Sequence, residues 1–216
     1  MQRLTLPLAL AVVALGAACA NLERSRNVAD PGVSGTTLAQ QVCSNCHGIS
    51  GNSVSPNFPN LAAQQKAYLV AQLEGFRKPG RSDPAGFEYM WGLSHHLTDK
   101  QIGELADYFA AQKVVSPRAG NPLQAAKGKE IFEQGLPAQS IPACKSCHGE
   151  QGMGMDGVAP RIADQHADYI VKQLKVFQRT DQRPAGPAMK VVAHGLTEEN
   201  MEEVAQYLQS MTTPAP

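Results

Sequence analysis

The chain has 216 residues, of which 19 are basic and 19 are acidic. This balance excludes the strongly basic character that is typical of nucleic-acid-binding proteins, and it indicates no strongly acidic partner. At this length the chain forms either one large domain or two small domains of roughly 100 residues each.

The N-terminal segment, residues 1–20, has the composition of an export signal. Arg3 supplies positive charge, an apolar stretch runs from Leu4 to Leu15, and Ala18-Cys19-Ala20 forms an A-x-A cleavage site. The stretch is shorter than the roughly 20 apolar residues of a membrane-spanning helix, and no other candidate span follows it. We therefore expect a signal peptide that is removed and a mature chain without a transmembrane segment.

Cys19 is the odd one of five cysteines and permits a second interpretation of this segment. It could be the acylated N-terminal cysteine of a lipoprotein, which would tether the protein to a membrane. Lipoprotein signals usually carry a bulky apolar residue three places before the cysteine, and Gly16 occupies that place here. A lipid anchor at Cys19 is therefore the less favoured alternative to cleavage after Ala20.

Two copies of a Cys-x-x-Cys-His motif are the strongest chemical signal in the chain. On a helix, positions i, i+3 and i+4 share one face, so both sulfurs and the imidazole can approach one flat ligand. Two thiols can form thioethers with the vinyl groups of a porphyrin, and the histidine can bind its iron. Each motif therefore predicts one covalent haem c, held by Cys43, Cys46 and His47 in the first copy and by Cys144, Cys147 and His148 in the second.

Other uses of a Cys-x-x-Cys pair are less favoured. A zinc ribbon places its second pair roughly 15 to 20 residues after the first, whereas 101 residues separate Cys43 from Cys144. A thioredoxin-like redox pair requires strands that alternate with helices, and neither motif has a run of alternating β-branched residues beside it. Zinc, a disulfide and chance remain the alternatives to haem.

The elements expected in the first half are helices joined by turn-rich loops. We expect a flexible leader over residues 21–35, a helix over 36–46, a loop to Pro59, a helix over 61–76 and a second loop over 78–86. The last helix begins after Thr98, because Gln101 completes a capping box. Its apolar face then follows at helical spacing, with Ile102, Leu105, Ala106 and Phe109.

The second half repeats this order with a register shift of 101 residues. Pro59 and Pro160 each follow their histidine by 12 residues, and the Leu-Ala-x-Gln that begins at Leu61 recurs as Ile-Ala-x-Gln from Ile162. Beyond the second loop the shift becomes 99. The repeat predicts an all-α fold of two tandem domains, residues 21–118 and 119–216, joined by a Pro- and Gly-rich linker at about residues 112–124.

The second axial ligand of each iron decides between electron transfer and catalysis. Met90 and Met189 occupy equivalent places under the shift of 99, after the second loop and before the last helix. A neutral thioether stabilises ferrous iron, and two filled axial positions leave no site for oxygen or peroxide. His95 and His194 coincide under the same shift and remain the rival ligands.

Together these features resemble the cytochrome c4 family of two-haem c-type cytochromes. The resemblance rests on the two Cys-x-x-Cys-His-Gly motifs, the two Pro-x-[Leu/Ile]-Ala-x-Gln stretches and the paired methionines before Leu-Thr. It implies two class I cytochrome c domains that face each other, each wrapped around one covalent haem. It also implies that the carbonyls of Pro59 and Pro160 accept the second N–H of His47 and His148.

The resemblance further implies a function. We expect a periplasmic carrier of single electrons between respiratory-chain partners, and not an enzyme. Its partners would be redox proteins such as a quinol-oxidising complex and a membrane terminal oxidase. The alternatives are a two-haem redox enzyme of the peroxidase or thiosulfate-oxidising type, and the cytochrome subunit of a membrane dehydrogenase or oxidase complex.

Overall fold

The computed structural model describes residues 25–84, 86–115, 119–179, 182–184 and 186–211. The expected signal peptide and Cys19 lie outside these residues, as do residues 116–118 of the expected linker, so the boundary at residue 118 stays a prediction. Within the described residues the chain is helical and forms no β-strand, apart from isolated bridges between Leu136 and Ile141 and between Met155 and Ala159. None of the described helices is long and apolar enough to span a bilayer.

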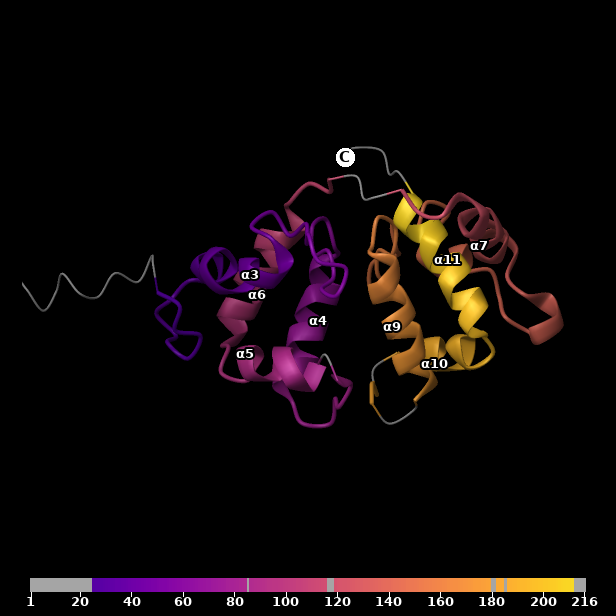
Figure 1. Ribbon diagram of the computed structural model, residues 1–216. Coiled ribbons are helices and arrows are strands. Elements are labelled where there is room, and N and C mark those ends of the chain that lie inside the picture. Colours follow the sequence, from indigo (N-terminus) through magenta and orange to yellow (C-terminus); the bar gives the residue numbers. More distant parts are fainter. Residues whose placement is uncertain (1–24, 85, 116–118, 180–181, 185, 212–216) are drawn as a thin grey trace, which may run out of the picture.

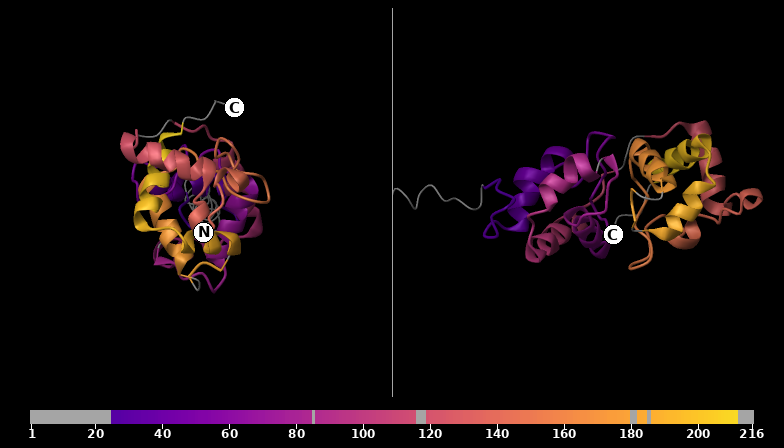
Figure 2. Two further views of the ribbon diagram at one scale, coloured as in Figure 1. Left: turned by 90° about the vertical axis from the view of Figure 1, so that its right-hand side faces the viewer. Right: turned by 90° about the horizontal axis from the view of Figure 1, so that it is seen from below.

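The described chain forms two helical halves side by side, residues 25–115 and 119–211 (Figure 1). Each half has its own hydrophobic core, which confirms the expected all-α, two-domain architecture. Figure 2 shows the same separation from two further directions. The first core contains Val33, Leu38, Ala39, Leu69, Leu97, Ile102, Leu105, Ala106 and Phe109, and the second contains Ile131, Phe132, Ile141, Ala167, Ile170, Leu174, Ala193, Leu196, Met201, Val204, Ala205 and Leu208.

The first half begins with a continuous helical run that ends at the first Cys-x-x-Cys-His motif. The run consists of α2 (Gly35–Leu38), the π-helical turn η2 (Ala39–Cys43) and α3 (Ser44–His47). It ends because Gly48 adopts φ 75°, a left-handed conformation that glycine takes without steric cost. The helix expected over residues 36–46 is therefore present, with one wider turn in its middle.

The later helices of the first half are α4 (Lys66–Arg77), the π-helical η3 (Gly86–Trp91), α5 (Gly92–Ser94) and α6 (Asp99–Ala110). The prediction that α4 begins at residue 61 is wrong. Leu61 and Ala62 instead donate their backbone N–H groups to the Gly51 carbonyl, and Ala63 has φ 53°, which a right-handed helix cannot contain. Residues 61–65 therefore lie before α4, where they can contact the second half.

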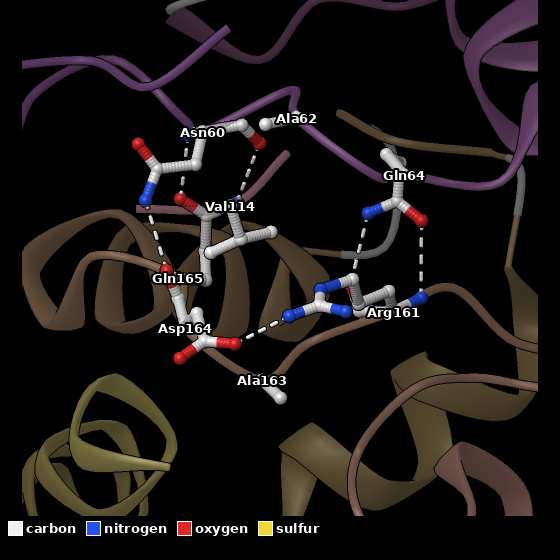
Figure 3. Close-up of a pocket in the computed structure, with 8 residues that line it drawn as sticks. All are labelled: Asn60, Ala62, Gln64, Val114, Arg161, Ala163, Asp164 and Gln165. Atoms are coloured by element: carbon white, nitrogen blue, oxygen red, sulfur yellow. Dashed lines mark hydrogen bonds and ion pairs between the residues drawn. The ribbon is translucent and has the colours of Figure 1, made fainter. Parts of the chain in front are cut away.

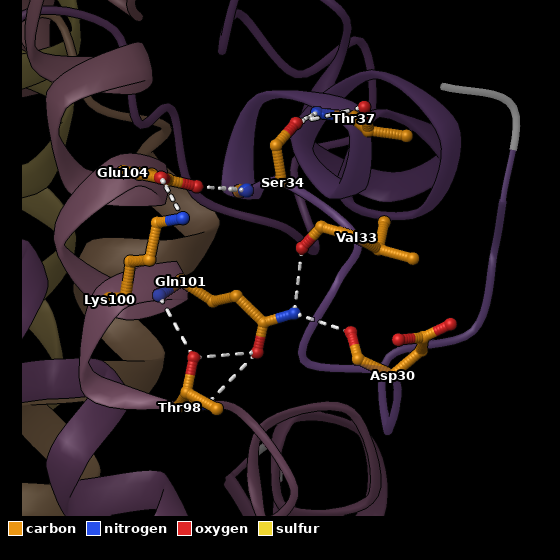
Figure 4. A network of polar contacts seen from close by, with 9 residues as sticks. Asp30, Val33, Ser34, Thr37, Thr98, Lys100, Gln101 and Glu104 are labelled. Carbon is orange, nitrogen blue, oxygen red and sulfur yellow. Dashed lines mark hydrogen bonds and ion pairs between the residues drawn. The ribbon is translucent and has the colours of Figure 1, made fainter. Parts of the chain in front are cut away.

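The expected capping box at the start of α6 is present, with Thr98 and Gln101 bonded reciprocally. The buried Gln101 amide also donates to the carbonyls of Asp30 at 2.9 Å and Val33 at 2.8 Å (Figure 4). Val33 is itself buried in the core. The expectation of a flexible leader is therefore wrong for residues 30–35, because α6 fixes their backbone.

The second half contains α7 (Pro122–Gln134), the 3₁₀ turn η4 (Pro137–Gln139), α8 (Lys145–His148), α9 (Ala167–Gln178), α10 (Pro187–His194) and α11 (Glu198–Ser210). It departs from the repeat before its motif. Helix α7 ends at Gly135, and residues 135–144 form an excursion before α8. The register shift of 101 residues therefore does not relate α2 to the first helix of the second half. In the second half it is α7, rather than the residues next to Cys144, that packs against α11 (Figure 1).

Candidate haem-binding sites

His47 closes the first motif at the end of α3, where only 7% of its surface is exposed. Its Nδ1 lies 2.9 Å from the Pro59 carbonyl oxygen. A carbonyl oxygen only accepts, so Nδ1 carries the hydrogen and Nε2 keeps the lone pair that can bind iron. Burial lowers the pKa of His47, which favours the neutral ring that ligation requires.

His148 repeats this geometry at the end of α8. Its Nδ1 lies 2.8 Å from the Pro160 carbonyl oxygen, and 7% of its surface is exposed. Burial lowers its pKa as well, so its Nε2 is also the basic nitrogen of a neutral ring. Pro59 and Pro160 thus make the contacts that the sequence resemblance implied, while iron ligation by the two histidines stays a prediction.

The four cysteines of the described residues form no disulfide and lie one helical turn apart within each motif. Burial raises the pKa of Cys43 to about 12 and that of Cys144 to about 11, which favours the neutral thiol at both positions. Paired thiols next to a neutral, oriented imidazole form the donor set that fits covalent haem c.

The candidate distal methionines lie on short helices between the second loop and the last helix of each half. Met90 is in η3 and Met189 is in α10, and both are partly buried. Met189 packs against the second core, whereas His194 is exposed. Residues five apart on an α-helix differ by about 140° in direction, so His194 and Met189 do not share a face. This geometry favours methionine in the second half.

The His95 side chain is held by contacts with residues close to it in the sequence. Its Nδ1 lies 3.1 Å from the Trp91 carbonyl oxygen, and its ring stacks on the Trp91 indole with centroids 4.5 Å apart. Met90 has no such local partner among the contacts of the described residues. The first half therefore also favours methionine as the distal ligand.

Two aromatic residues near the first site had no role in the sequence analysis. The Phe58 ring meets the His47 ring edge-on at 6.2 Å between centroids, and it meets the Tyr89 ring edge-on at 6.0 Å. Phe58 directly precedes Pro59, and Tyr89 directly precedes Met90. Apolar rings therefore link the segment behind the proximal histidine with the segment that carries the candidate distal ligand.

A pair of glutamine clamps joins the two halves next to these sites, and the sequence analysis missed their role. Gln64 donates from Nε2 to the Arg161 carbonyl at 2.9 Å, and its Oε1 accepts the Arg161 N–H at 3.0 Å. Gln165 donates from Nε2 to the Asn60 carbonyl at 2.9 Å, and its Oε1 accepts the Asn60 N–H at 2.8 Å. Figure 3 shows both clamps around a small pocket between the halves. The only sequence signal was the repeated glutamine of the Pro-x-[Leu/Ile]-Ala-x-Gln stretches.

A second polar contact between the halves lies around Arg183, which is 4% exposed. Its Nη2 donates to the Tyr68 hydroxyl at 3.0 Å and to Gln72 Oε1 at 2.8 Å, both on α4 of the other half. The N–H groups of Ser82 and Asp83 donate to the Gln182 carbonyl at 3.0 and 3.1 Å. This contact and the glutamine clamps therefore join the two halves at opposite ends of the facing helices α4 and α9 (Figure 1).

Comparison with known proteins matches both halves to one family. A family model described as cytochrome c matches residues 33–113 and again residues 125–212, so each match includes one Cys-x-x-Cys-His motif. The chain is 40% identical over 171 residues to cytochrome c-552 of Acidithiobacillus ferridurans, across 78% of this chain and 73% of the relative. It also resembles the crystal structure of reduced recombinant cytochrome c4 from Pseudomonas stutzeri, with TM-score 0.73 and 34% identity over 82% of this chain and 97% of that chain.

A more distant relative has a name that indicates its electron donor. It is the thiosulfate dehydrogenase electron acceptor of Stutzerimonas stutzeri (strain A1501), and it is 28% identical over 181 residues, which cover 82% of each chain. The match therefore extends over both halves of this chain.

Proposed function

Because the chain belongs to the cytochrome c4 family, we propose that it carries single electrons in the periplasm between respiratory-chain partners, toward a membrane terminal oxidase. The chain is an electron-transfer protein and not an enzyme, and it binds two haem c groups covalently. The observation that carries the proposal is the repeated pair of sites, each with an oriented, neutral histidine and a partly buried methionine.

Each half would hold its haem with residues from two segments, the Cys-x-x-Cys-His motif and the helix that carries the methionine. The cysteines of the motif would form the thioethers, the motif histidine would bind iron through Nε2, and Met90 or Met189 would fill the opposite position. When bound, haem c supplies an iron that accepts and releases one electron. The protein's own contribution is to fix both axial ligands and to exclude water and oxygen from the iron.

The contact between the halves supports electron exchange within one molecule. Four hydrogen bonds from the two glutamine clamps join segments that directly follow the prolines bonded to the proximal histidines. Such contacts hold the two sites at a fixed separation, which electron transfer between them requires. An electron that enters one half can therefore leave through the other.

A first experiment tests ligation. The ferric wild-type protein should show the long-wavelength sulfur-to-iron charge-transfer band, and a potentiometric titration should count two haems. Met90→Ala and Met189→Ala should each remove about half of the band, whereas His95→Ala and His194→Ala should leave it intact. An unchanged band in the methionine variants would contradict the assignment.

A second experiment tests the class of function. With both axial positions filled, the reduced native protein should not bind carbon monoxide. Stoichiometric binding at one haem without denaturation would instead favour a two-haem redox enzyme. The wild-type protein, freshly reduced and free of mediators, is the sample for this measurement.

A third experiment tests partners and location. The reduced protein should be oxidised by membranes that contain a terminal oxidase, and it should be recovered in the periplasmic fraction. The mass of the mature N-terminus separates cleavage after Ala20 from a lipid anchor at Cys19. A second candidate electron donor is a thiosulfate dehydrogenase, because a relative with 28% identity is named as the acceptor of that enzyme. Reduction by that enzyme with thiosulfate would support it.

A further inference from the structure

The peptide bond behind each proximal histidine is hydrogen-bonded on both sides. In the first half, the carbonyl of the Pro59–Asn60 peptide accepts from His47 Nδ1 at 2.9 Å. The N–H of the same peptide, on Asn60, donates to Gln165 Oε1 at 2.8 Å. His47 and Gln165 thus bond to opposite ends of one amide group, although they belong to different halves.

The second half repeats this chain of bonds in the reverse direction. The carbonyl of the Pro160–Arg161 peptide accepts from His148 Nδ1 at 2.8 Å, and its N–H donates to Gln64 Oε1 at 3.0 Å. The two chains are therefore reciprocal: each half supplies the glutamine that bonds to the other half's peptide. Gln64 and Gln165 are 7% and 8% exposed, so water competes little for these bonds.

Hydrogen bonds in series polarise one another. A peptide N–H that donates makes its own carbonyl a better acceptor, by about 10 to 30% per bond in condensed phase. A better acceptor draws the Nδ1 hydrogen of the histidine more strongly and gives the ring more imidazolate character. A more electron-rich imidazole stabilises ferric over ferrous iron and lowers the reduction potential.

We propose that Gln165 and Gln64 are positioning residues that each lower the reduction potential of the haem in the opposite half, acting through the peptide bonded to its proximal histidine. Gln165 acts on the haem held by His47, and Gln64 acts on the haem held by His148. This inference rests on the proposed function, because it requires both histidines to be iron ligands.

Other hydrogen bonds also join the two halves. Asn60 Nδ2 also donates to the Asp164 carbonyl at 2.8 Å, and Lys172 Nζ donates to Asn57 Oδ1 at 2.6 Å, and neither bond touches the peptide N–H groups. These contacts join the same surfaces without polarising a histidine-bound carbonyl. They therefore provide control positions at which a purely structural effect can be measured.

The potentials of both haems would then depend on how the halves are docked. If the halves separated, both peptide N–H groups would exchange a buried glutamine oxygen for water. Both potentials would change together, although neither axial ligand had moved. The way in which the halves are docked would therefore affect the reduction potential of each haem.

The test uses the two-haem holoprotein and the variants Gln165→Leu and Gln64→Leu. Gln165→Leu removes the acceptor for the Asn60 N–H, so the potential of the haem in the first half should rise while the other stays near its wild-type value. Gln64→Leu should raise the other potential alone, and the double variant should raise both. Backbone amide exchange at Asn60 and Arg161 independently reports the loss of each bond.

Control variants separate tuning from adhesion. Asn60→Ala removes the side-chain bonds to the Asp164 carbonyl and to the Ser53 N–H but keeps the Asn60 N–H on Gln165, so both potentials should stay near wild type. Gln165→Ala removes the same acceptor with a smaller side chain, so the potential of the first haem should rise, and this variant serves if Gln165→Leu fails to fold. Lys172→Ala should also leave both potentials in place.

Three outcomes would overturn the inference. The first is unchanged potentials in the leucine variants despite faster exchange at Asn60 and Arg161. The second is an equal shift of both haems in each single variant, and the third is a shift in Asn60→Ala as large as that in Gln165→Leu. Failure of the proposed function is distinguishable, because it would appear in the wild-type protein as missing haem or as an iron without histidine ligation.

Discussion

Gly128 in α7 lies directly against Glu203 in α11. A Cβ built on Gly128 would lie 1.9 Å from the Glu203 carbonyl oxygen, a separation that real Cβ atoms do not reach. Gly35 in the first half faces α6 in the same way, with 2.7 Å from its ideal Cβ to the Gln101 carbonyl oxygen. In both halves a glycine therefore allows the first helix to cross the last helix at backbone contact.

Gly128→Ala should destabilise the second half. The added methyl group meets backbone rather than a flexible side chain, so α7 must move away from α11, and overpacking of this kind costs about 1–3 kcal/mol or more. Urea unfolding followed by circular dichroism measures the loss. Gly103→Ala in α6 is the matched control, because its Cβ would meet nothing within 4 Å. That variant should gain up to about 1 kcal/mol from helix propensity, and an equal loss in both variants would contradict the packing argument.

The double variant Cys43→Ala, Cys46→Ala should carry one covalent haem instead of two. It keeps His47 but lacks both thiols that would form the thioethers of the first site. Intact mass under denaturing conditions and the pyridine haemochrome assay each count the covalent haem per chain. The matched variant Cys144→Ala, Cys147→Ala should lose the other haem. Two haems retained in either variant would refute the assignment of the motifs.

Asp164→Asn should destabilise the protein much more than loss of a surface ion pair. Asp164 forms an ion pair with Arg161, and the side chains are only 3% and 4% exposed. The substitution removes the negative charge that faces a buried guanidinium, and breaking a buried ion pair in this way costs about 3–5 kcal/mol. Asparagine tolerates the left-handed backbone at this position, where φ is 61°, so the backbone is not the cause.

The control for this prediction is Asp107→Ala, which breaks the exposed pair between Lys66 and Asp107. The Lys66 and Asp107 side chains are 55% and 62% exposed, and Lys66 Nζ lies 2.6 Å from Asp107 Oδ1. Exposed pairs contribute about 0–1 kcal/mol, so this variant should unfold almost like the wild type. Equal losses in urea unfolding for the two variants would show that burial does not determine the cost.

Stability should fall at alkaline pH because of Tyr169 in α9. Burial, together with the nearby Tyr68, raises the pKa of Tyr169 to about 12 from 10.0. The folded state then holds a proton that the unfolded state loses above about pH 10. This contribution to the free energy of unfolding is fully present below pH 10 and is lost as the pH rises through about 12, by at most about 1.4 kcal/mol per pH unit.

The pH dependence is checked by urea unfolding of the wild type and of Tyr169→Phe at a series of alkaline pH values. The phenylalanine variant lacks the ionisable hydroxyl and should show a shallower loss of stability. Tyr89→Phe removes an exposed hydroxyl and should keep the wild-type slope. Identical slopes for wild type and Tyr169→Phe would exclude Tyr169 as the cause.

Local sequence signals predicted the parts of the fold that depend on local interactions. The capping box of Thr98 and Gln101 and the apolar face of α6 follow from spacing alone, and both are present. The predicted start of α4 was wrong because Leu61 and Ala62 donate to the Gly51 carbonyl, and Ala63, with φ 53°, donates to the Phe109 carbonyl. Both partners lie outside the segment. Propensity has no access to such tertiary bonds.

The same distinction between local and tertiary interactions applies to the candidate sites. Residues within each Cys-x-x-Cys-His motif are set by helical spacing, and the contact from His47 to Pro59 was implied by family resemblance. The glutamine clamps were not predicted, because their partners belong to the opposite half and only docking brings them together. Similarly, the close contact of Gly128 with α11 could not be predicted, because it depends on how two helices that are far apart in sequence pack together.

The contact around Arg183 has a consequence for the equivalence of the two halves. Arg183 precedes Pro-Ala-Gly in the second half, and Asp83 precedes the same three residues in the first half. Both side chains are buried, and Asp83 attracts the Arg183 charge across the contact. Asp83 also forms an ion pair with Arg81 of its own half, whereas Arg183 donates to Tyr68 and Gln72 of the other half. The duplicated halves are therefore not interchangeable at this contact, because each contributes a different charged side chain.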